Sequence, residues 1–367
     1  MYSEQDLQSA VAAGAISSEA AGTLRAHAAS LRSAPVADEE QFRLITGFND
    51  IFVTIACALV IFASASVGGE MAGWLSGALV AAACWLMAEM FTRKRRMALP
   101  SIVLLLAFAV GLGAAASQLA GLLMPPHEVR RPYVVGTNPE YWTQMTRYPW
   151  QEATMAAVGA LVAALGAFVH WLRFRVSITI AAGIGAVVLL LLSVVAAATD
   201  QDLGSNAFIA PAALVCGLGV FAYAMKWDLS DTVRQTQRAD IAFWLHLLAA
   251  PLIAHPLFYW MGVTSGEEIG SLAAVGVLAI YILFGVVALA IDRRALLVSA
   301  LAYVLVAMGQ LFQNYGAVEL NVALTALVIG SALLALSAFW SPIRSALVAK
   351  LPGSVQSRLP GGVAIAA

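Results

Sequence analysis

Two histidines and two prolines share one apolar stretch of the chain, near residues 241–261. His246 and His255 are ionisable groups in a segment apolar enough to lie in a membrane, where such groups usually bind a ligand or pair with another group. Pro251 and Pro256 each remove a backbone donor, which weakens a helix at that point. The histidines are nine residues apart, so on a straight helix they face opposite directions after about 900° of turn. This spacing disfavours a shared metal site.

Other polar side chains fall at a similar depth in neighbouring apolar stretches, in the half of the membrane that we assign to the outside. They are Ser117, Gln118, Tyr259, Gln310, Gln313, Asn314 and Asn321. A polar vestibule open to the outside would gather these groups, with Gln118, His255, Gln310 and Gln313 as substrate-binding residues. Scattered hydrogen bonds between helices are the alternative explanation.

The long connection between residues 124 and 149 is rich in aromatic residues and contains five prolines. A connection of this length is usually either functional or disordered. Its side chains Arg130, Arg131 and Trp142 could cover the vestibule and bind an anionic headgroup or a sugar. A segment lying on the membrane surface is the other interpretation.

Short signatures of common enzymes do not occur in the sequence. It contains no Gly-x-x-x-x-Gly-Lys phosphate loop, no Gly-x-Ser-x-Gly elbow and no pair of intramembrane aspartates. The three cysteines lie in apolar stretches without metal-ligand spacing. We therefore predict no catalytic residue, metal site, cofactor or nucleic-acid partner, while a membrane enzyme that acts on lipid-linked substrates through an unfamiliar site stays open.

The composition places these residues in a membrane. Hydrophobic residues make up 61% of the 367 residues and charged residues only 11%, against about 25% charged residues in a soluble domain. Ten apolar runs are each long enough to cross about 30 Å of hydrocarbon. They lie near residues 49–67, 71–91, 98–123, 151–171, 176–198, 205–225, 241–261, 269–291, 295–313 and 319–340.

The distribution of basic residues supports this count. With ten spans and a cytoplasmic N-terminus, 17 of the 20 Lys and Arg residues fall on the cytoplasmic side. The short outside connections carry acidic residues and no Lys or Arg. This alternation is what the positive-inside rule predicts for a bacterial inner-membrane protein with both ends in the cytoplasm.

A few residues within or beside the runs have structural interpretations. Glu89 is four residues before Arg93 and can pair with it on one helix face. His170 is expected at the membrane interface. Small residues at positions such as Gly77, Gly113 and Gly159 allow close helix approach.

The sequence thus predicts an all-α fold, a polytopic transmembrane helical bundle of about ten spans with a small cytoplasmic helical hairpin at its N-terminus. The hairpin occupies residues 1–34, with a turn at Gly14 and a helix capped by Ser17. The expected linker, membrane domain and cytoplasmic tail are residues 35–46, 47–341 and 342–367.

The segment Leu7 to Ala28, LQSAVAAGAISSEAAGTLRAHA, resembles the N-terminal hairpin of bacterial membrane proteins of unknown function. The pattern leucine, glycine, isoleucine, serine, glutamate falls on Leu7, Gly14, Ile16, Ser17 and Glu19. The segment ITGFNDIFVTIACALVIFA, from Ile45, is similar to the first spans of such proteins. The resemblance covers about the first sixth of the chain and implies no activity.

Two functions from different classes remain. The first is a carrier of a small molecule or lipid-like substrate, which the polar groups and the two prolines favour. The second is a scaffold or sensor in the lipid bilayer, which recruits a protein partner through the hairpin or assembles as a homo-oligomer. A carrier needs a solvent-reachable cavity near the middle of the membrane, whereas a scaffold is packed solid.

Overall fold

The computed structural model of the protein describes residues 9–24, 48–135, 138–204, 206–232, 234, 236–263, 271–294, 296–297, 300–301, 303–305, 321–356 and 359. The chain divides into two compact units, Met1–Phe42 and Arg43–Ala367. In the first unit, residues 9–12 and 18–24 are helical. Gly14 has a φ of +71°, and the Ser17 hydroxyl accepts a hydrogen bond of 3.0 Å from the Ala20 amide. The turn and the cap therefore form where expected, while the hairpin as a whole stays a prediction.

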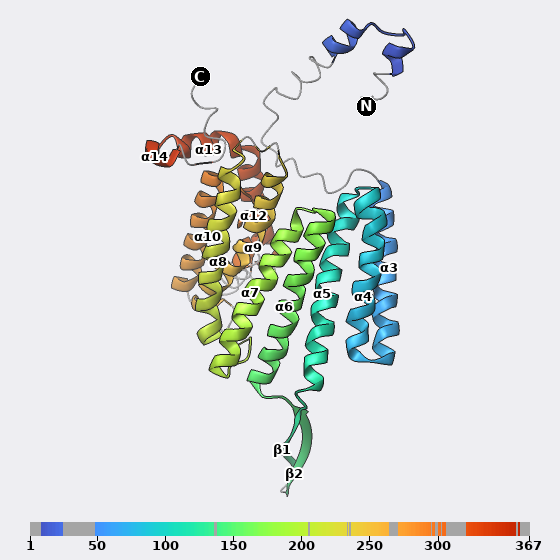
Figure 1. Ribbon diagram of the computed structural model, residues 1–367. Helices are drawn as coiled ribbons and strands as arrows, with labels where there is room; N and C mark the ends of the chain where they lie inside the picture. Colours follow the sequence, from blue (N-terminus) through green and yellow to red (C-terminus); the bar gives the residue numbers. More distant parts are fainter. Residues whose placement is uncertain are drawn as a thin grey trace. The chain divides into compact units, whose positions relative to one another are not determined.

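The second unit is a helical bundle with one short β-hairpin (Figure 1). Its first long helices are α3 (Phe48–Met71), α4 (Gly73–Ala88) with the π-helical turn η1 (Glu89–Lys94), α5 (Ala98–Leu122) and α6 (Pro149–Phe174). They are followed by α7 (Ile178–Thr199), α8 (Asn206–Leu229), α9 (Gln237–Trp260), α10 (Ser271–Ile291) and α12 (Asn321–Ala338). Two short helices, α13 (Trp340–Val348) and α14 (Gly353–Gln356), come last.

Within the described residues, seven helices are long and apolar enough to cross a membrane, or eight if the bent pair α12–α13 counts as one span. The seven are α3, α4 with η1, α5, α6, α7, α8 and α9. Their outward side chains are apolar, as Phe62 and Leu165 illustrate with 72% and 58% exposure, so lipid rather than water suits this surface. Helix α10 is also apolar, with a shorter stretch, Val275–Ile291, among the residues compared, and most of the predicted run 295–313 lies outside the described residues. The chain is a membrane-embedded helical protein, and the count of ten spans stays a prediction.

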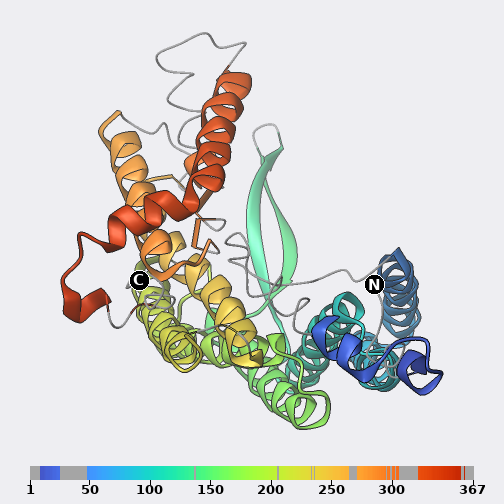
Figure 2. The same cartoon turned by 90° about the horizontal axis from the view of Figure 1, so that it is seen from above.

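From α3 to α9, helices that are neighbours in the sequence are neighbours in space, because their connections limit how far apart they can lie. Seen along the helices, α3 to α10 follow one another in a curved row (Figure 2). One core cluster lies between α3, α4 and α5, and a larger one lies around α9, which packs against α7 and α8. Helix α9 is thus surrounded by protein along much of its length.

Glycines set the closest helix contacts, as the sequence predicts. A Cβ added to Gly159 on α6 would lie 2.6 Å from the carbonyl oxygen of Gly113 on α5. A Cβ added to Gly77 on α4 would lie 2.8 Å from the backbone nitrogen of Ala115. Both distances are too short for a real side chain, so these backbones can approach only because the residues are glycines.

The connection between α5 and α6 is an ordered hairpin of strands β1 (His127–Val135) and β2 (Asn138–Thr146), paired antiparallel. These two strands were not predicted from the sequence. Its base is tied to α5, since Arg147 donates to the carbonyl oxygens of Met124 at 3.0 Å and Gly121 at 3.4 Å. These are carbonyls at the end of a helix, which lack helical donors and attract a cation.

The predicted tail contains most of α13 and all of α14. Helix α12 ends at Ala338, and α13 continues the chain at an angle of 71° to it. Trp340 and Val348 on α13 are buried against the bundle, where Trp340 joins a core cluster with Leu296 and Leu297. Helix α13 therefore lies across one end of the bundle rather than continuing the span (Figure 1).

Candidate functional site

His255 lies on α9, one residue before the second proline of that helix. Its Nδ1 atom is 2.9 Å from the hydroxyl oxygen of Tyr303, and the Tyr303 ring stacks on Phe258 with centroids 4.7 Å apart. Tyr303 belongs to the predicted run 295–313, so the imidazole contacts that segment through a tyrosine. Gln310 and Gln313 lie outside the described residues.

Gln118 is placed elsewhere in the bundle. Its side-chain oxygen lies against Gly73, since a Cβ added to that glycine would be 2.6 Å away from it. Gln118 is thus at the contact between α5 and α4, whereas His255 contacts Tyr303 from α9. Among the described residues, the structure does not gather Gln118 and His255 around a common vestibule.

The three residues predicted from the α5–α6 connection lie on the β-hairpin. Arg131 is paired in register with Trp142, and Arg130 with Thr143. Because neighbouring positions of a strand lie on opposite faces, Arg130 lies on the face opposite to that of Trp142. Its only ion pair among the described residues is with Glu128 at 3.9 Å, where both side chains are more than half exposed and the pair stabilises little. Whether Arg130, Arg131 and Trp142 bind a substrate stays a prediction.

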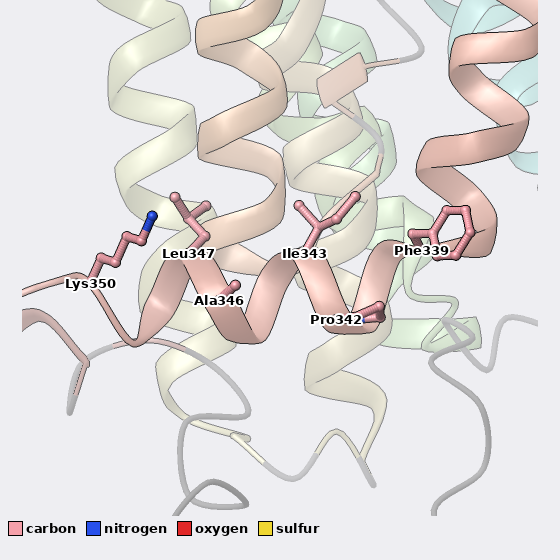
Figure 3. Close-up of a pocket in the computed structure, with 6 residues that line it drawn as sticks. All are labelled: Phe339, Pro342, Ile343, Ala346, Leu347 and Lys350. Carbon is pink, nitrogen blue, oxygen red and sulfur yellow. The ribbon is translucent and has the colours of Figure 1, made fainter.

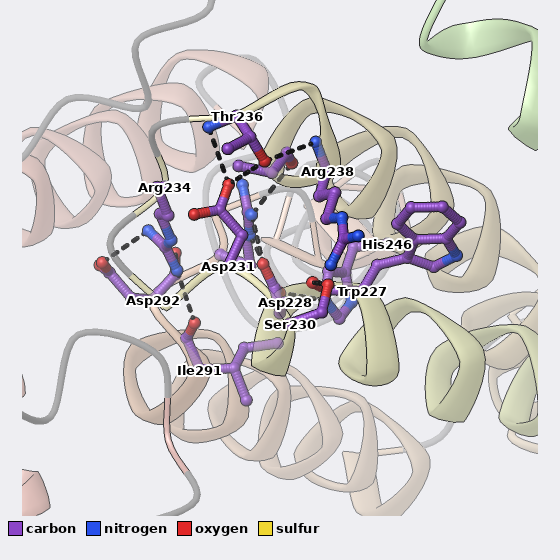
Figure 4. A network of polar contacts seen from close by, with 12 residues as sticks. Trp227, Asp228, Ser230, Asp231, Arg234, Thr236, Arg238, His246, Ile291 and Asp292 are labelled. Atoms are coloured by element: carbon purple, nitrogen blue, oxygen red, sulfur yellow. Dashed lines mark hydrogen bonds and ion pairs between the residues drawn. The ribbon is translucent and has the colours of Figure 1, made fainter.

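A buried ionic cluster that was not predicted from the sequence is formed by Asp228, His246 and Arg293. Figure 4 shows Asp228 and His246. Asp228 is near the end of α8, His246 is on α9, and Arg293 is two residues past the end of α10. The side chains of Asp228 and His246 are 0% exposed, and that of Arg293 is 3% exposed. The cluster therefore joins three helices at a point that water does not reach.

The geometry of the cluster fixes the hydrogen-bonding roles. Arg293 donates through Nη2 to one Asp228 carboxylate oxygen and through Nε to the other at 3.2 Å, which is the strong two-pronged arrangement. His246 Nε2 is 2.8 Å from the same carboxylate, which can only accept, so Nε2 must carry the proton. The other ring nitrogen, Nδ1, is buried and has no hydrogen-bond partner among the described residues.

A second polar group lies beside the first, around Asp292. Arg234, in the α8–α9 connection, donates to the Asp292 carboxylate at 2.8 Å and to the backbone oxygens of Ile291 and Asp292 at 3.1 Å each. The Trp340 indole donates to the other Asp292 carboxylate oxygen at 2.8 Å, and Arg344 is 3.7 Å from it. These contacts cap the end of α10 and attach α13 to it.

Together, the two groups hold the ends of α8, α9, α10 and α13 at one end of the bundle. We call it the basic end, because it carries Lys94, Arg175, Arg234, Arg238, Arg293 and Arg294. Within the described part of the chain, no three His, Cys, Asp or Glu side chains lie close enough to hold a metal ion. The contacts at the cluster allow charge pairing and the transfer of a proton between Asp228 and His246.

Two further polar residues, Glu89 and His170, stabilise contacts between helices. Glu89 pairs with Arg93 at 3.1 Å, as predicted, and also with Arg173 of α6 at 2.7 Å. His170 was expected at the interface but is 1% exposed, among Trp85, Phe108 and Phe174. The imidazole there fills space between aromatic rings.

No sequence motif predicts the ionic cluster, but one feature of the sequence points to Asp228. Asp228 is a charged residue that closely follows an apolar run, near Lys226, Arg234 and Arg238. Its partners are 18 and 65 residues away, so only the packing of α8, α9 and α10 brings the three together. Comparison with known proteins adds no further guide, since no family model, curated protein or solved structure matches the chain.

Proposed function

We propose that the chain is a carrier of a small molecule or lipid-like substrate in the bacterial inner membrane, with the basic end in the cytoplasm. The observation that supports it most is the ionic cluster Asp228–His246–Arg293, whose histidine lies on α9, a helix that contains two prolines. Charged groups inside a membrane bundle are costly and are retained mainly where they serve ion or substrate movement.

Helix α9 has the parts that a moving element of a carrier needs. Its first half is fixed by His246 in the cluster, and its second half carries His255. Pro251 lies between the two histidines and Pro256 directly follows His255. Each proline removes one hydrogen bond of the helix. The second half can then tilt about the prolines while the first half stays attached to α8 and α10. In this proposal His255 and Tyr303 contact the substrate, together with Gln310 and Gln313.

Cysteine labelling tests the carrier proposal directly. In a variant whose three native cysteines are replaced by alanine, His255→Cys is exposed to a membrane-impermeant maleimide in vesicles of each orientation. We expect labelling from both sides, because a carrier presents its site to each side in turn. Leu245→Cys is the control, since Leu245 is 0% exposed and lies in the same helix. Labelling of His255→Cys from one side only, or from neither, would show that the chain is no carrier.

A scaffold is the second candidate, and one observation favours it. Residues Met1–Phe42 form a compact unit separate from the membrane-embedded one. A scaffold would bind its protein partner or a second copy of the chain through this unit, while the bundle stays closed. In the labelling experiment a scaffold gives no reaction at His255→Cys from at least one side, so the same measurement separates the two functions.

A further inference from the structure

An apolar groove lies in the angle between α12 and α13, outside the residues discussed above (Figure 3). Its volume is about 560 Å³, which is within the range of small-molecule sites. It is lined by Phe339, Pro342, Ile343, Ala346, Leu347 and Lys350. The side chains of Phe339, Ile343, Leu347 and Lys350 project from the side of α13 on which α12 rises (Figure 3).

The groove is a stable feature of the fold because α13 is fastened through a different face. Trp340 donates to Asp292, Arg344 lies 3.7 Å from the same carboxylate, and the Arg294 guanidinium lies 4.8 Å from the Trp340 ring centroid. These contacts leave the groove side of α13 uncovered, with Phe339 59% and Ile343 41% exposed.

The groove side of α13 is expected to face the membrane. Helix α12 has an apolar, exposed surface, including Leu334 at 74% exposure, and α13 leaves it at 71°. A short helix that turns off the end of an apolar span lies in the plane of the membrane interface, with its apolar side toward the acyl chains. The groove thus opens to lipid at the level of the headgroups.

Lys350 supplies the charge that selects among lipids. It lies at the end of the groove away from Phe339 (Figure 3), and its ammonium has no carboxylate partner among the described residues. A lysine at this level extends its charge to the headgroup region while its methylenes stay on apolar surface. We propose that the groove is a binding site for an anionic phospholipid, whose acyl chain lies along Phe339, Ile343 and Leu347 and whose phosphate contacts Lys350.

Native mass spectrometry of the delipidated full-length protein tests this site. Dioleoyl phosphatidylglycerol and dioleoyl phosphatidylcholine are each titrated, and the bound fraction is measured for wild type, Lys350→Gln and Lys94→Gln. We expect wild type to prefer phosphatidylglycerol, and Lys350→Gln to weaken its binding about fivefold, the effect of one lysine near a lipid headgroup. Lys94→Gln changes the same charge at the basic end but away from the groove, and should bind as wild type does.

A second variant tests the groove itself. Ala346→Trp fills the space between Ile343 and Leu347 and should lower the binding of both lipids, while the exposure of Ala346 lets the protein keep its melting temperature. Equal binding by Lys350→Gln and Lys94→Gln, equal binding of the two lipids by wild type, or wild-type binding by Ala346→Trp would each overturn the proposal.

Discussion

Removing either charged member of the ionic cluster should destabilise the protein far more than removing both. Asp228→Asn leaves the Arg293 guanidinium, 3% exposed, without its carboxylate, and Arg293→Met leaves the carboxylate with only a neutral imidazole. A buried charge that loses its partner costs about 3–5 kcal/mol, whereas replacement of the whole pair is often nearly neutral. Each single variant should therefore lower the free energy of unfolding by about 3–5 kcal/mol. The double variant should lose clearly less than the sum of the two.

The measurement is unfolding in mixed micelles with increasing SDS, followed by tryptophan fluorescence and repeated for the four members of the double-mutant cycle. The cycle isolates the coupling between the two side chains from the effect of each substitution elsewhere. His246→Asn removes an imidazole bonded to a charged acceptor and should cost about 1.5–3 kcal/mol. Additive losses for Asp228 and Arg293, or single losses below about 0.5 kcal/mol as at surface positions, would refute the buried pair.

Two further substitutions test the packing of the bundle by the same unfolding measurement. Gly77→Ala should cost about 1–3 kcal/mol, because the new methyl group meets backbone atoms of α5. Gly69→Ala is its control, since a Cβ there meets nothing within 4 Å, and it should gain about 0.5–1 kcal/mol. Arg147→Ala should cost about 1 kcal/mol and speed proteolysis of the β-hairpin, because two carbonyls of the α5 end lose their donor. Arg130, whose side chain is 76% exposed, provides the control, because Arg130→Ala should change neither the free energy of unfolding nor the rate of proteolysis. Equal effects of Arg147→Ala and Arg130→Ala would contradict the capping role of Arg147.

The helices could be predicted because their signals are local. A long apolar run without charges specifies a membrane helix by itself, and the seven runs before residue 262 all appear as helices close to the expected bounds. The contact at Gly77 and the pair Glu89–Arg93 were also predictable, since each depends on spacing within one helix. The β-hairpin was not predicted. Val129 and the aromatic residues of this segment favour a strand, but its prolines and arginines argue against one.

The candidate site could not be predicted in the same way. His246 was recognised as unusual, but nothing in the sequence says which charge it meets, because Asp228 and Arg293 come from other helices. Arg293 was counted among the residues that set topology, and its side chain instead enters the bundle. A basic residue beside a span can serve both purposes, and only tertiary packing distinguishes them.

The two histidines of α9 define what kind of motion the bundle permits. His246 is held at the basic end by a buried hydrogen bond to the Asp228 carboxylate, whereas His255 is held by a single hydrogen bond to a half-buried tyrosine. Breaking the first contact removes a hydrogen bond to a charged acceptor and costs about 1.5–3 kcal/mol, whereas breaking the second exchanges one neutral hydrogen bond for another at a net cost of about 1 kcal/mol. Since Pro251 and Pro256 weaken the helix near His255, any rearrangement of α9 should begin at that half and leave the basic end in place. A carrier built this way opens first on the side away from the basic end, and its ionic cluster acts as the fixed point of the movement.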